Sequence, residues 1–204
     1  TDVTDASGTG LFHVEKRKWS RDMLMHLEVS PYLLPDTMES TSISGKLSDE
    51  TALKTGLLPG IPVMAGSSST VSRMIGSGAL QNDIATISID SAGLIVVSTD
   101  HYVNVPKGKI HCYCHGFPAK WILNGVVLSA GESFTWFKEN FAEKELLTEA
   151  ITKQDAFDLL TESAKSVPSG AEGLMYLPYL TGERTPRNNP QAKGVFFWDQ
   201  FEAS

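Results

Sequence analysis

At 204 residues the chain is long enough for one large domain or for parts of two, and its 41% apolar and 20% charged residues are ordinary for a globular protein. No run of 18 apolar residues is present to span a membrane, and a net charge of −7 without a stripe of lysine and arginine argues against a nucleic-acid partner. This composition is typical of many cytosolic enzymes. The first residue is threonine and the last residues follow an apolar burst, so we expect both ends to be cut.

The first third of the chain predicts short elements. Residues 1–12 place small and polar residues before an apolar pair, which predicts a turn that enters a strand. Residues 19–29 carry apolar side chains at helical spacing, with Ser20 as the N-cap. A second short helix is predicted to follow Ser48 and to end at Gly56.

We expect the remainder of the chain to be organised around residues 60–93. This stretch predicts a strand (61–65), a small-residue turn (66–70), a short helix, a second strand (84–89) and a tight turn (90–93). A strand that runs into a glycine- and serine-rich turn at a helix start leaves backbone N–H groups pointing outward, which suits phosphate. The turns match neither the P-loop nor the dinucleotide fingerprint.

Strands and helices mix in the second half, which supports a layered α/β or α+β fold. Residues 94–99 are predicted to pair with 84–89 as a hairpin. The other predicted elements are strands in 110–116 and 120–129, an amphipathic helix in 132–141, helices in 145–151 and 155–165, and a buried strand in 173–180.

Two side-chain groups invite a functional interpretation. On a strand, Cys112 and Cys114 point to one face while His111 and His115 point to the other, so the candidate metal ligands are divided. We therefore expect two reduced thiols and no metal, and a metal-binding module is the minor alternative. In the loop 181–187, Arg184 either clamps an anion or forms a loop-fixing ion pair with Glu183, which is the commoner arrangement.

Together these segments resemble the middle of an FGGY-family carbohydrate kinase, most closely the xylulokinases. The segments that carry the resemblance are TDVTDASGTGLF (1–12), WS (19–20), LLP (33–35), TGL (55–57), PGIPV (59–63), CHGFPAKW (114–121), GVVLSAG (125–131) and GLMYLPYLTGERTP (173–186). The resemblance implies a partial, actin-like (ribonuclease H-like) α/β ATPase fold that spans the junction of two domains. Residues 1–79 would be the C-terminal part of the sugar-binding domain, and residues 80–204 the first half of the ATP-binding domain.

The resemblance also implies a reaction and a site. ATP with Mg²⁺ would phosphorylate a sugar hydroxyl in an interdomain cleft, converting D-xylulose to xylulose 5-phosphate. The family's aspartate base falls on Ser69, and the substrate-binding turn on residues Ser68, Ser69 and Thr70. The cofactor-binding positions are Ser88, Asp90, Ser91, Gly93 and Gly131. Gluconate, glycerol and ribulose kinases share the fold, so the sugar stays open.

Three positions depart from the family pattern. A serine at position 69 is no usable base near neutral pH, and losing a positioned base costs on the order of 10²–10⁴ in rate. Asp90 replaces a glycine of the phosphate turn, and Glu132 adds a second carboxylate beside Gly131. We expect a kinase fragment without phosphotransfer; the alternative is a non-catalytic sugar- or nucleotide-binding pseudokinase module. A homodimer is also expected if apolar residues near the C-terminus, such as 196–198, are exposed.

Overall fold

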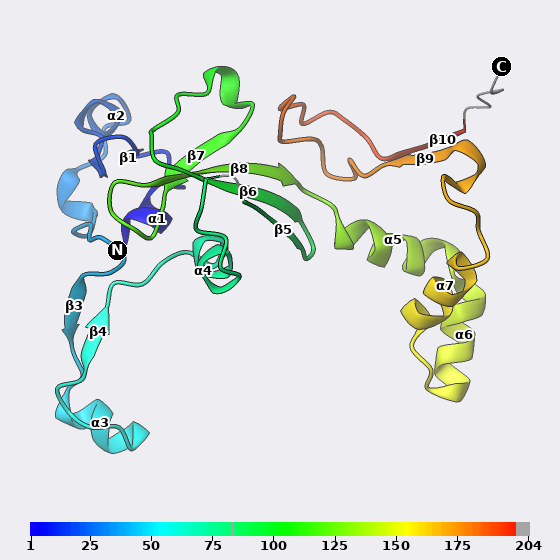
Figure 1. Cartoon of the computed structure of the whole chain (residues 1–204), viewed down its shortest axis with the longest axis horizontal. Helices are drawn as coiled ribbons and strands as arrows, with labels where there is room; N and C mark the ends of the chain where they lie inside the picture. Colours follow the sequence, from blue (N-terminus) through cyan, green and yellow to red (C-terminus); the bar gives the residue numbers. More distant parts are fainter. Residues whose placement is uncertain (83, 199–204) are drawn as a thin grey trace. The chain divides into compact units, whose positions relative to one another are not determined.

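The computed structural model describes residues 1–82 and 84–198, and the chain divides into two compact units. Unit 1 comprises residues 1–86 and 95–124, and unit 2 comprises residues 87–94 and 125–204. Helices and strands mix in both units (Figure 1). Among the described helices, none is long and apolar enough to cross a membrane.

The elements in chain order fall into two series. Up to residue 82 they are α1 (Val3–Ala6), β1 (Phe12–His13), β2 (Lys18–Trp19), α2 (Arg21–His26), η1 (Pro31–Leu33), β3 (Ile43–Lys46), α3 (Asp49–Thr55), β4 (Pro62–Met64) and α4 (Ser69–Gly76). From residue 84 onward they are β5 (Ala85–Ile89), β6 (Gly93–Thr99), η2 (Pro106–Gly108), β7 (His111–Cys114), β8 (Trp121–Val127), α5 (Gly131–Phe141), α6 (Glu143–Thr152), α7 (Ala156–Ala164), η3 (Ala171–Gly173), β9 (Leu174–Leu177) and β10 (Val195–Trp198).

The largest sheet has four strands in the order β5-β6-β8-β7. β5 and β6 are neighbours joined by the turn at residues 90–92, which confirms the predicted hairpin. β7 runs antiparallel to β8, with Cys112 opposite Leu123 and Cys114 opposite Trp121. Alternate residues of β8, including Ile122 and Val126, are buried, as expected for a strand with one face covered.

The core of unit 1 forms where α1, β1 and β7 meet. Val3, Ala6, Phe12 and Cys114 are each at most 7% exposed and form one cluster. The Phe12 ring meets the ring of Trp19 edge to face, with 5.5 Å between centroids. The cluster therefore joins the first 19 residues to a strand about one hundred positions later in the chain.

α4 packs against the turn that joins β7 to β8. Val71 and Met74 are 0% exposed on the buried face of the helix. A Cβ atom at Gly116 would lie 3.0 Å from the Cδ1 atom of Ile75 and 3.1 Å from the Cγ1 atom of Val71. Glycine at position 116 thus lets the turn approach the helix closely.

β3 and β4 form an antiparallel hairpin that carries α3 at its end (Figure 1). Ser48 caps α3 by accepting the Thr51 N–H, and Gly56 ends the helix in the left-handed conformation, as predicted. The predicted cap of α2 is likewise confirmed, because the Ser20 side chain accepts the Met23 N–H at 3.3 Å.

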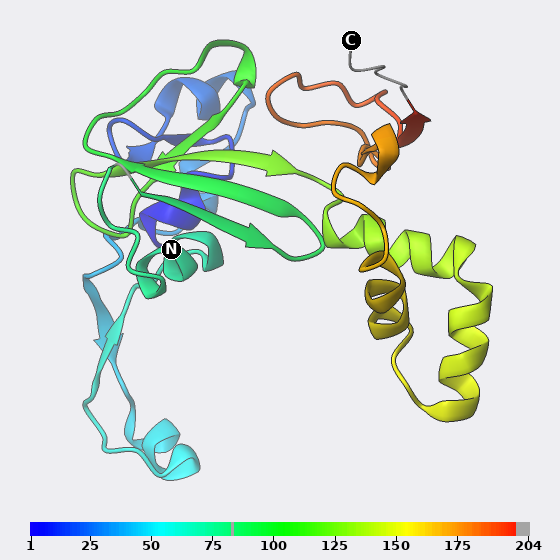
Figure 2. The ribbon, with the colours of Figure 1, turned by 45° about the vertical axis from the view of Figure 1, so that its right-hand side comes forward.

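Unit 2 contains three consecutive helices and a two-stranded sheet. α6 packs against α7, and the two lie side by side in both views (Figure 2). β9 pairs with β10, which places Tyr176 opposite Phe196 with their rings stacked at 4.5 Å. The Trp136 ring of α5 stacks on Tyr176 at 6.4 Å, so aromatic side chains join the helix to the sheet.

Two sequence predictions on secondary structure were wrong in part. Residues 3–6 form a helical turn that was not predicted, because the Asp2 side chain accepts the N–H groups of Thr4 and Asp5, whereas the predicted strand is present as β1 (Phe12–His13). The predicted buried strand is the shorter β9, in which Leu174, Met175 and Leu177 are 37–49% exposed. β9 pairs only with β10 among the described strands. Most apolar side chains of this two-stranded sheet are therefore left exposed.

Candidate active site

The turn with the predicted base position lies in unit 1, between β4 and α4. Gly66 has a φ of +83°, a left-handed conformation that favours glycine. Ser68 is the N-cap of α4, and its side chain accepts the Val71 N–H at 3.4 Å. Ser69 and Thr70 are therefore the first two residues of α4, and Ser69 is exposed.

The side chain at position 69 lacks the chemistry of a general base. A serine hydroxyl donates one proton and accepts hydrogen bonds, but it stays protonated near neutral pH. Proton abstraction requires a group whose pKa lies near the working pH. The Ser69 side chain is thus able to hydrogen-bond a hydroxyl group but not to remove its proton.

The predicted phosphate turn lies in unit 2, between β5 and β6. The Asp90 N–H donates to the Ala92 carbonyl at 2.9 Å, which closes the turn. One carboxylate oxygen of Asp90 accepts the N–H of Ser91 at 3.0 Å. The Asp90 side chain therefore binds a backbone donor of its own turn.

The N-terminus of α5 contacts the same turn. Gly131 N–H donates to the Asp90 carbonyl at 2.9 Å, and a Cβ atom at position 131 would lie 2.5 Å from that oxygen. The Ser91 carbonyl accepts the N–H groups of Ala130 at 2.9 Å and of Glu132 at 3.2 Å. Glycine is required at position 131 because the turn approaches the helix so closely.

Several backbone N–H groups around this turn already have acceptors within the chain. The chain's own oxygens accept the N–H groups of Ser91, Ala130, Gly131 and Glu132. The carboxylate of Asp90 also places a negative charge in this turn, and a negative charge repels phosphate. Among the predicted cofactor-binding residues, Asp90, Ser91 and Gly131 contact one another directly.

The other two predicted cofactor-binding residues lie beside this turn, on the two strands of the hairpin. Ser88 is a half-buried residue of β5. Gly93 begins β6, where a Cβ atom would lie 3.1 Å from the Cβ atom of Ala130. The five positions predicted to bind the cofactor thus belong to unit 2, whereas Ser68–Thr70 belong to unit 1.

The loop 181–187 is fixed by hydrogen bonds to the backbone. Glu183 is 6% exposed, and its carboxylate accepts the Arg187 N–H at 3.0 Å. The Thr185 hydroxyl donates to the Val126 carbonyl at 2.9 Å and accepts the Val126 N–H. The expected ion pair between Glu183 and Arg184 is not among the ion pairs of the described residues, so a backbone contact holds the loop instead.

The cysteine- and histidine-rich strand is β7. Burial raises the pKa of the Cys114 thiol, which donates to the Val14 carbonyl at 3.4 Å. His115 is 0% exposed; burial, followed by the nearby charges of Lys120 and Arg17, lowers its pKa to about 4. Within residues 1–82 and 84–198, no group of three or more His, Cys, Asp or Glu side chains is arranged to hold a metal ion.

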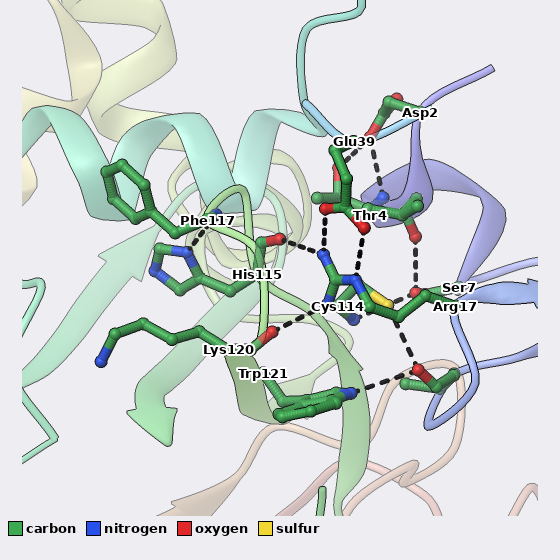
Figure 3. A network of polar contacts seen from close by, with 12 residues as sticks. Asp2, Thr4, Ser7, Arg17, Glu39, Cys114, His115, Phe117, Lys120 and Trp121 are labelled. Carbon is green, nitrogen blue, oxygen red and sulfur yellow. Dashed lines mark hydrogen bonds and ion pairs between the residues drawn. The ribbon is translucent and has the colours of Figure 1, made fainter. Parts of the chain in front are cut away.

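One half-buried ion pair has no signal in the sequence. Arg17 and Glu39 lie in segments without a recognisable motif, and their charged atoms approach to 2.6 Å (Figure 3). Arg17 also donates to the carbonyls of His115 and Lys120. Glu39 lies 22 positions from Arg17, and the two carbonyls lie about one hundred positions from it. No local sequence pattern indicates partners at such distances.

Comparison with known proteins identifies the class to which this fold and these turns belong. Residues 1–76 match the N-terminal domain of the FGGY family of carbohydrate kinases, and residues 85–201 match the C-terminal domain of that family. The chain belongs to the FGGY family of carbohydrate kinases.

Among curated relatives, the chain is similar to the xylulose kinase of Bacillus subtilis, with 35% identity over 95% of this chain and 37% of that protein. It is also similar to the gluconokinase of the same species, with 31% identity over 96% of this chain and 38% of that protein. The chain thus spans less than two fifths of the length of these relatives.

A solved structure supports the fold. The ligand-bound xylulose kinase of Lactobacillus acidophilus superposes with a TM-score of 0.78 and 26% identity, over 96% of this chain and 38% of that one. The predicted fold class, a partial actin-like α/β ATPase fold, is therefore confirmed.

Proposed function

We propose that the chain is part of a xylulokinase-like sugar kinase in which phosphotransfer from ATP is strongly reduced. Family membership and the xylulose kinase relatives support D-xylulose as the acceptor, and gluconate is the alternative acceptor suggested by the gluconokinase. Residues 1–79 would belong to the sugar-binding domain, and residues 80–204 to the ATP-binding domain. A cytoplasmic location and a homodimer stay predictions from the sequence.

One observation carries the proposal of reduced activity. The Asp90 carboxylate accepts the Ser91 N–H at 3.0 Å, and the carbonyls of the same two residues accept the first N–H groups of α5. A phosphate would have to displace these contacts and approach a fixed negative charge. Ser69 adds an independent loss, because without a positioned base the hydroxyl of the sugar keeps its proton.

The role of Asp90 is tested by titrating MgATP into the 204-residue chain with isothermal calorimetry. We expect no measurable binding by the wild type and measurable binding by Asp90→Gly. Asp90→Asn separates two causes, because the amide oxygen still accepts the Ser91 N–H while the charge is lost. If Asp90→Gly binds MgATP no better than the wild type, the proposed obstruction is wrong.

Activity is tested by a coupled assay for ADP release with D-xylulose and with gluconate. The wild type should release no ADP above background, and robust release dependent on D-xylulose would contradict the proposal. Ser69→Asp combined with Asp90→Gly should raise the rate, with either single variant as the matched control. If the double variant is inactive, another lesion limits phosphotransfer.

The retained scaffold together with the obstructed turn also favours a second function. A pseudokinase module would bind a sugar through the turn at residues 68–70 and transfer no phosphate. Saturable binding of D-xylulose without ADP release would favour this module over a reduced kinase.

A further inference from the structure

The short helix α1 and its cap contain three buried polar side chains. Asp2 is 5% exposed, Thr4 is 4% exposed and Ser7 is 7% exposed. Burying a hydroxyl or a carboxylate is costly unless hydrogen bonds replace those to water. The hydrogen-bond partners of these three side chains therefore identify the segments that α1 holds in place (Figure 3).

The Thr4 hydroxyl joins the cap of α1 to the start of α4. It donates its proton to the Asp2 carboxylate, and it accepts the Ser68 N–H at 2.7 Å. A hydroxyl has one proton, so donation to Asp2 directs an oxygen lone pair toward Ser68. Thr4 and Ser68 are 64 positions apart, which makes this a tertiary contact.

The Ser7 hydroxyl makes the same kind of contact with a different segment. It donates to the Val3 carbonyl at 2.7 Å and accepts the Cys114 N–H at 3.0 Å. Each hydroxyl is thus oriented by a local acceptor and fixes a backbone N–H from a distant element. Thr4 locates α4, and Ser7 locates β7.

The contact with Ser68 is the last backbone anchor before α4 begins. Upstream, the N–H groups of Ala65 and Gly66 donate to the carbonyls of Ser42 and Ser40. Ser68 then caps the helix whose first residue is Ser69. The position of the Ser68 backbone therefore sets where the side chain at position 69 starts.

We propose that Thr4 is a positioning residue for the turn Ser68–Thr70, and that it acts through the Ser68 N–H with Asp2 orienting its hydroxyl. The assignment of position 69 as the base position rests on the proposed function, but the contact between Thr4 and Ser68 does not. Two measurements on the same variants separate the two claims.

The first measurement is amide hydrogen exchange in the 204-residue chain, followed by NMR. Thr4→Val keeps the shape but removes the hydroxyl, and exchange at Ser68 should accelerate about tenfold or more, since a buried donor loses its acceptor. Thr4→Ser keeps the hydroxyl and should restore slow exchange. Thr9→Val is the matched control, because the Thr9 hydroxyl contacts only its own segment in the described structure, at Ala6 and Leu11.

Exchange at Cys114 serves as a second, independent readout, because Ser7 and not Thr4 contacts that N–H. Ser7→Ala should accelerate exchange at Cys114 and leave Ser68 unchanged. If Thr4→Val accelerates exchange throughout α4, including the buried Val71, then Thr4→Ala is measured in its place. Unchanged exchange at Ser68 in a folded variant without the hydroxyl, or failure of Thr4→Ser to restore it, would overturn the proposal.

The second measurement places the Thr4 variants in the background of Ser69→Asp with Asp90→Gly. There Thr4→Val should lower kcat about tenfold or more with KM for the sugar little changed, and Thr4→Ser should restore kcat. A rise in KM with kcat unchanged would contradict a positioning role. If that background is inactive, the proposed function has failed, and the exchange experiment still decides whether Thr4 positions the turn.

Discussion

Arg17 and Glu39 form an ion pair through two hydrogen bonds, from Nε to Oε1 at 2.7 Å and from Nη2 to Oε2 at 2.6 Å. The Arg17 side chain is 13% exposed, and two of its remaining N–H groups donate to the carbonyls of Lys120 at 3.0 Å and His115 at 3.2 Å. One guanidinium group thus joins the β1–β2 turn, the segment before β3 and the β7–β8 connection (Figure 3).

Replacing Arg17 should destabilise unit 1. Arg17→Met leaves Glu39 and two carbonyls without their donor, and we expect a loss of about 2–3 kcal/mol in the free energy of unfolding. Arg17→Lys should recover only part, because an ammonium group lacks the planar fork. Urea denaturation followed by circular dichroism measures both.

The control for Arg17 is an exposed ion pair of the same unit. Lys54 and Glu50 approach to 2.6 Å but are 72% and 78% exposed. Lys54→Met should change stability by no more than about 0.5 kcal/mol. Equal losses of unfolding free energy in Arg17→Met and Lys54→Met would show that the lower exposure of the Arg17–Glu39 pair adds nothing to stability.

A methionine comparison tests the core beneath α4. Met74 is 0% exposed, so Met74→Ala should cost about 2–5 kcal/mol through lost burial and a cavity. Met25 is 77% exposed, and Met25→Ala should be close to neutral. The difference between the two unfolding midpoints, at equal denaturant slopes, checks the prediction.

The buried His115 should make stability depend on pH. Its pKa is lowered to about 4, chiefly by burial, whereas an unfolded histidine titrates near 6.5. The unfolded state therefore binds more protons between these values, and stability falls as the pH falls from about 6.5 toward 4. The loss is about 1.4 kcal/mol for each unit by which the pKa is lowered.

Two variants separate His115 from other acid-labile groups. His115→Asn retains a side chain able to accept the Phe117 N–H, which reaches Nδ1 at 2.9 Å, and it should flatten the slope between pH 4 and 6.5. His26→Asn, on the exposed end of α2, should leave the slope unchanged. An unaltered slope in His115→Asn would assign the acid sensitivity to carboxylates.

Gly131 should tolerate no side chain. In Gly131→Ala the new Cβ would lie 2.5 Å from the Asp90 carbonyl oxygen, so the turn must move, at a cost of about 1–3 kcal/mol. Gly76, also helical, has nothing within 4 Å of a new Cβ, and Gly76→Ala should be neutral or stabilising. Thermal melting of the pair tests whether the close contact has the expected cost.

Elements with local signals could be predicted from the sequence. Ser20 and Ser48 mark helix starts by their own side chains, and Gly56 marks a helix end, since these signals need no distant partner. The helix α1 also has a local cap, Asp2, but four residues are too few for a stable isolated helix, and its distant contact between Thr4 and Ser68 leaves no local signal. Propensity alone cannot reveal a contact across 64 positions.

In the candidate site, too, local features could be predicted and contacts between distant segments could not. The sequence pattern placed Ser69 in the small-residue turn before a helix and Asp90 in a hairpin turn. The structure has both features, with α4 beginning at Ser69 itself. The hydrogen bonds of the N–H groups at the start of α5 could not be foreseen, because they result from a contact between segments 39–41 positions apart in the chain. The sequence pattern locates a turn, but only the tertiary contacts show whether its donors are free.

The hairpin of β3 and β4 has a further consequence. All seven of its strand residues are exposed, and large apolar side chains line the hairpin and α3, among them Ile43, Leu53, Leu58, Val63 and Met64. A two-stranded hairpin is marginally stable without a covering layer, so this arm should open at a lower free energy than unit 1 as a whole. Limited proteolysis should therefore cleave within residues 43–64 first, while the fragments around the Arg17 ion pair stay associated.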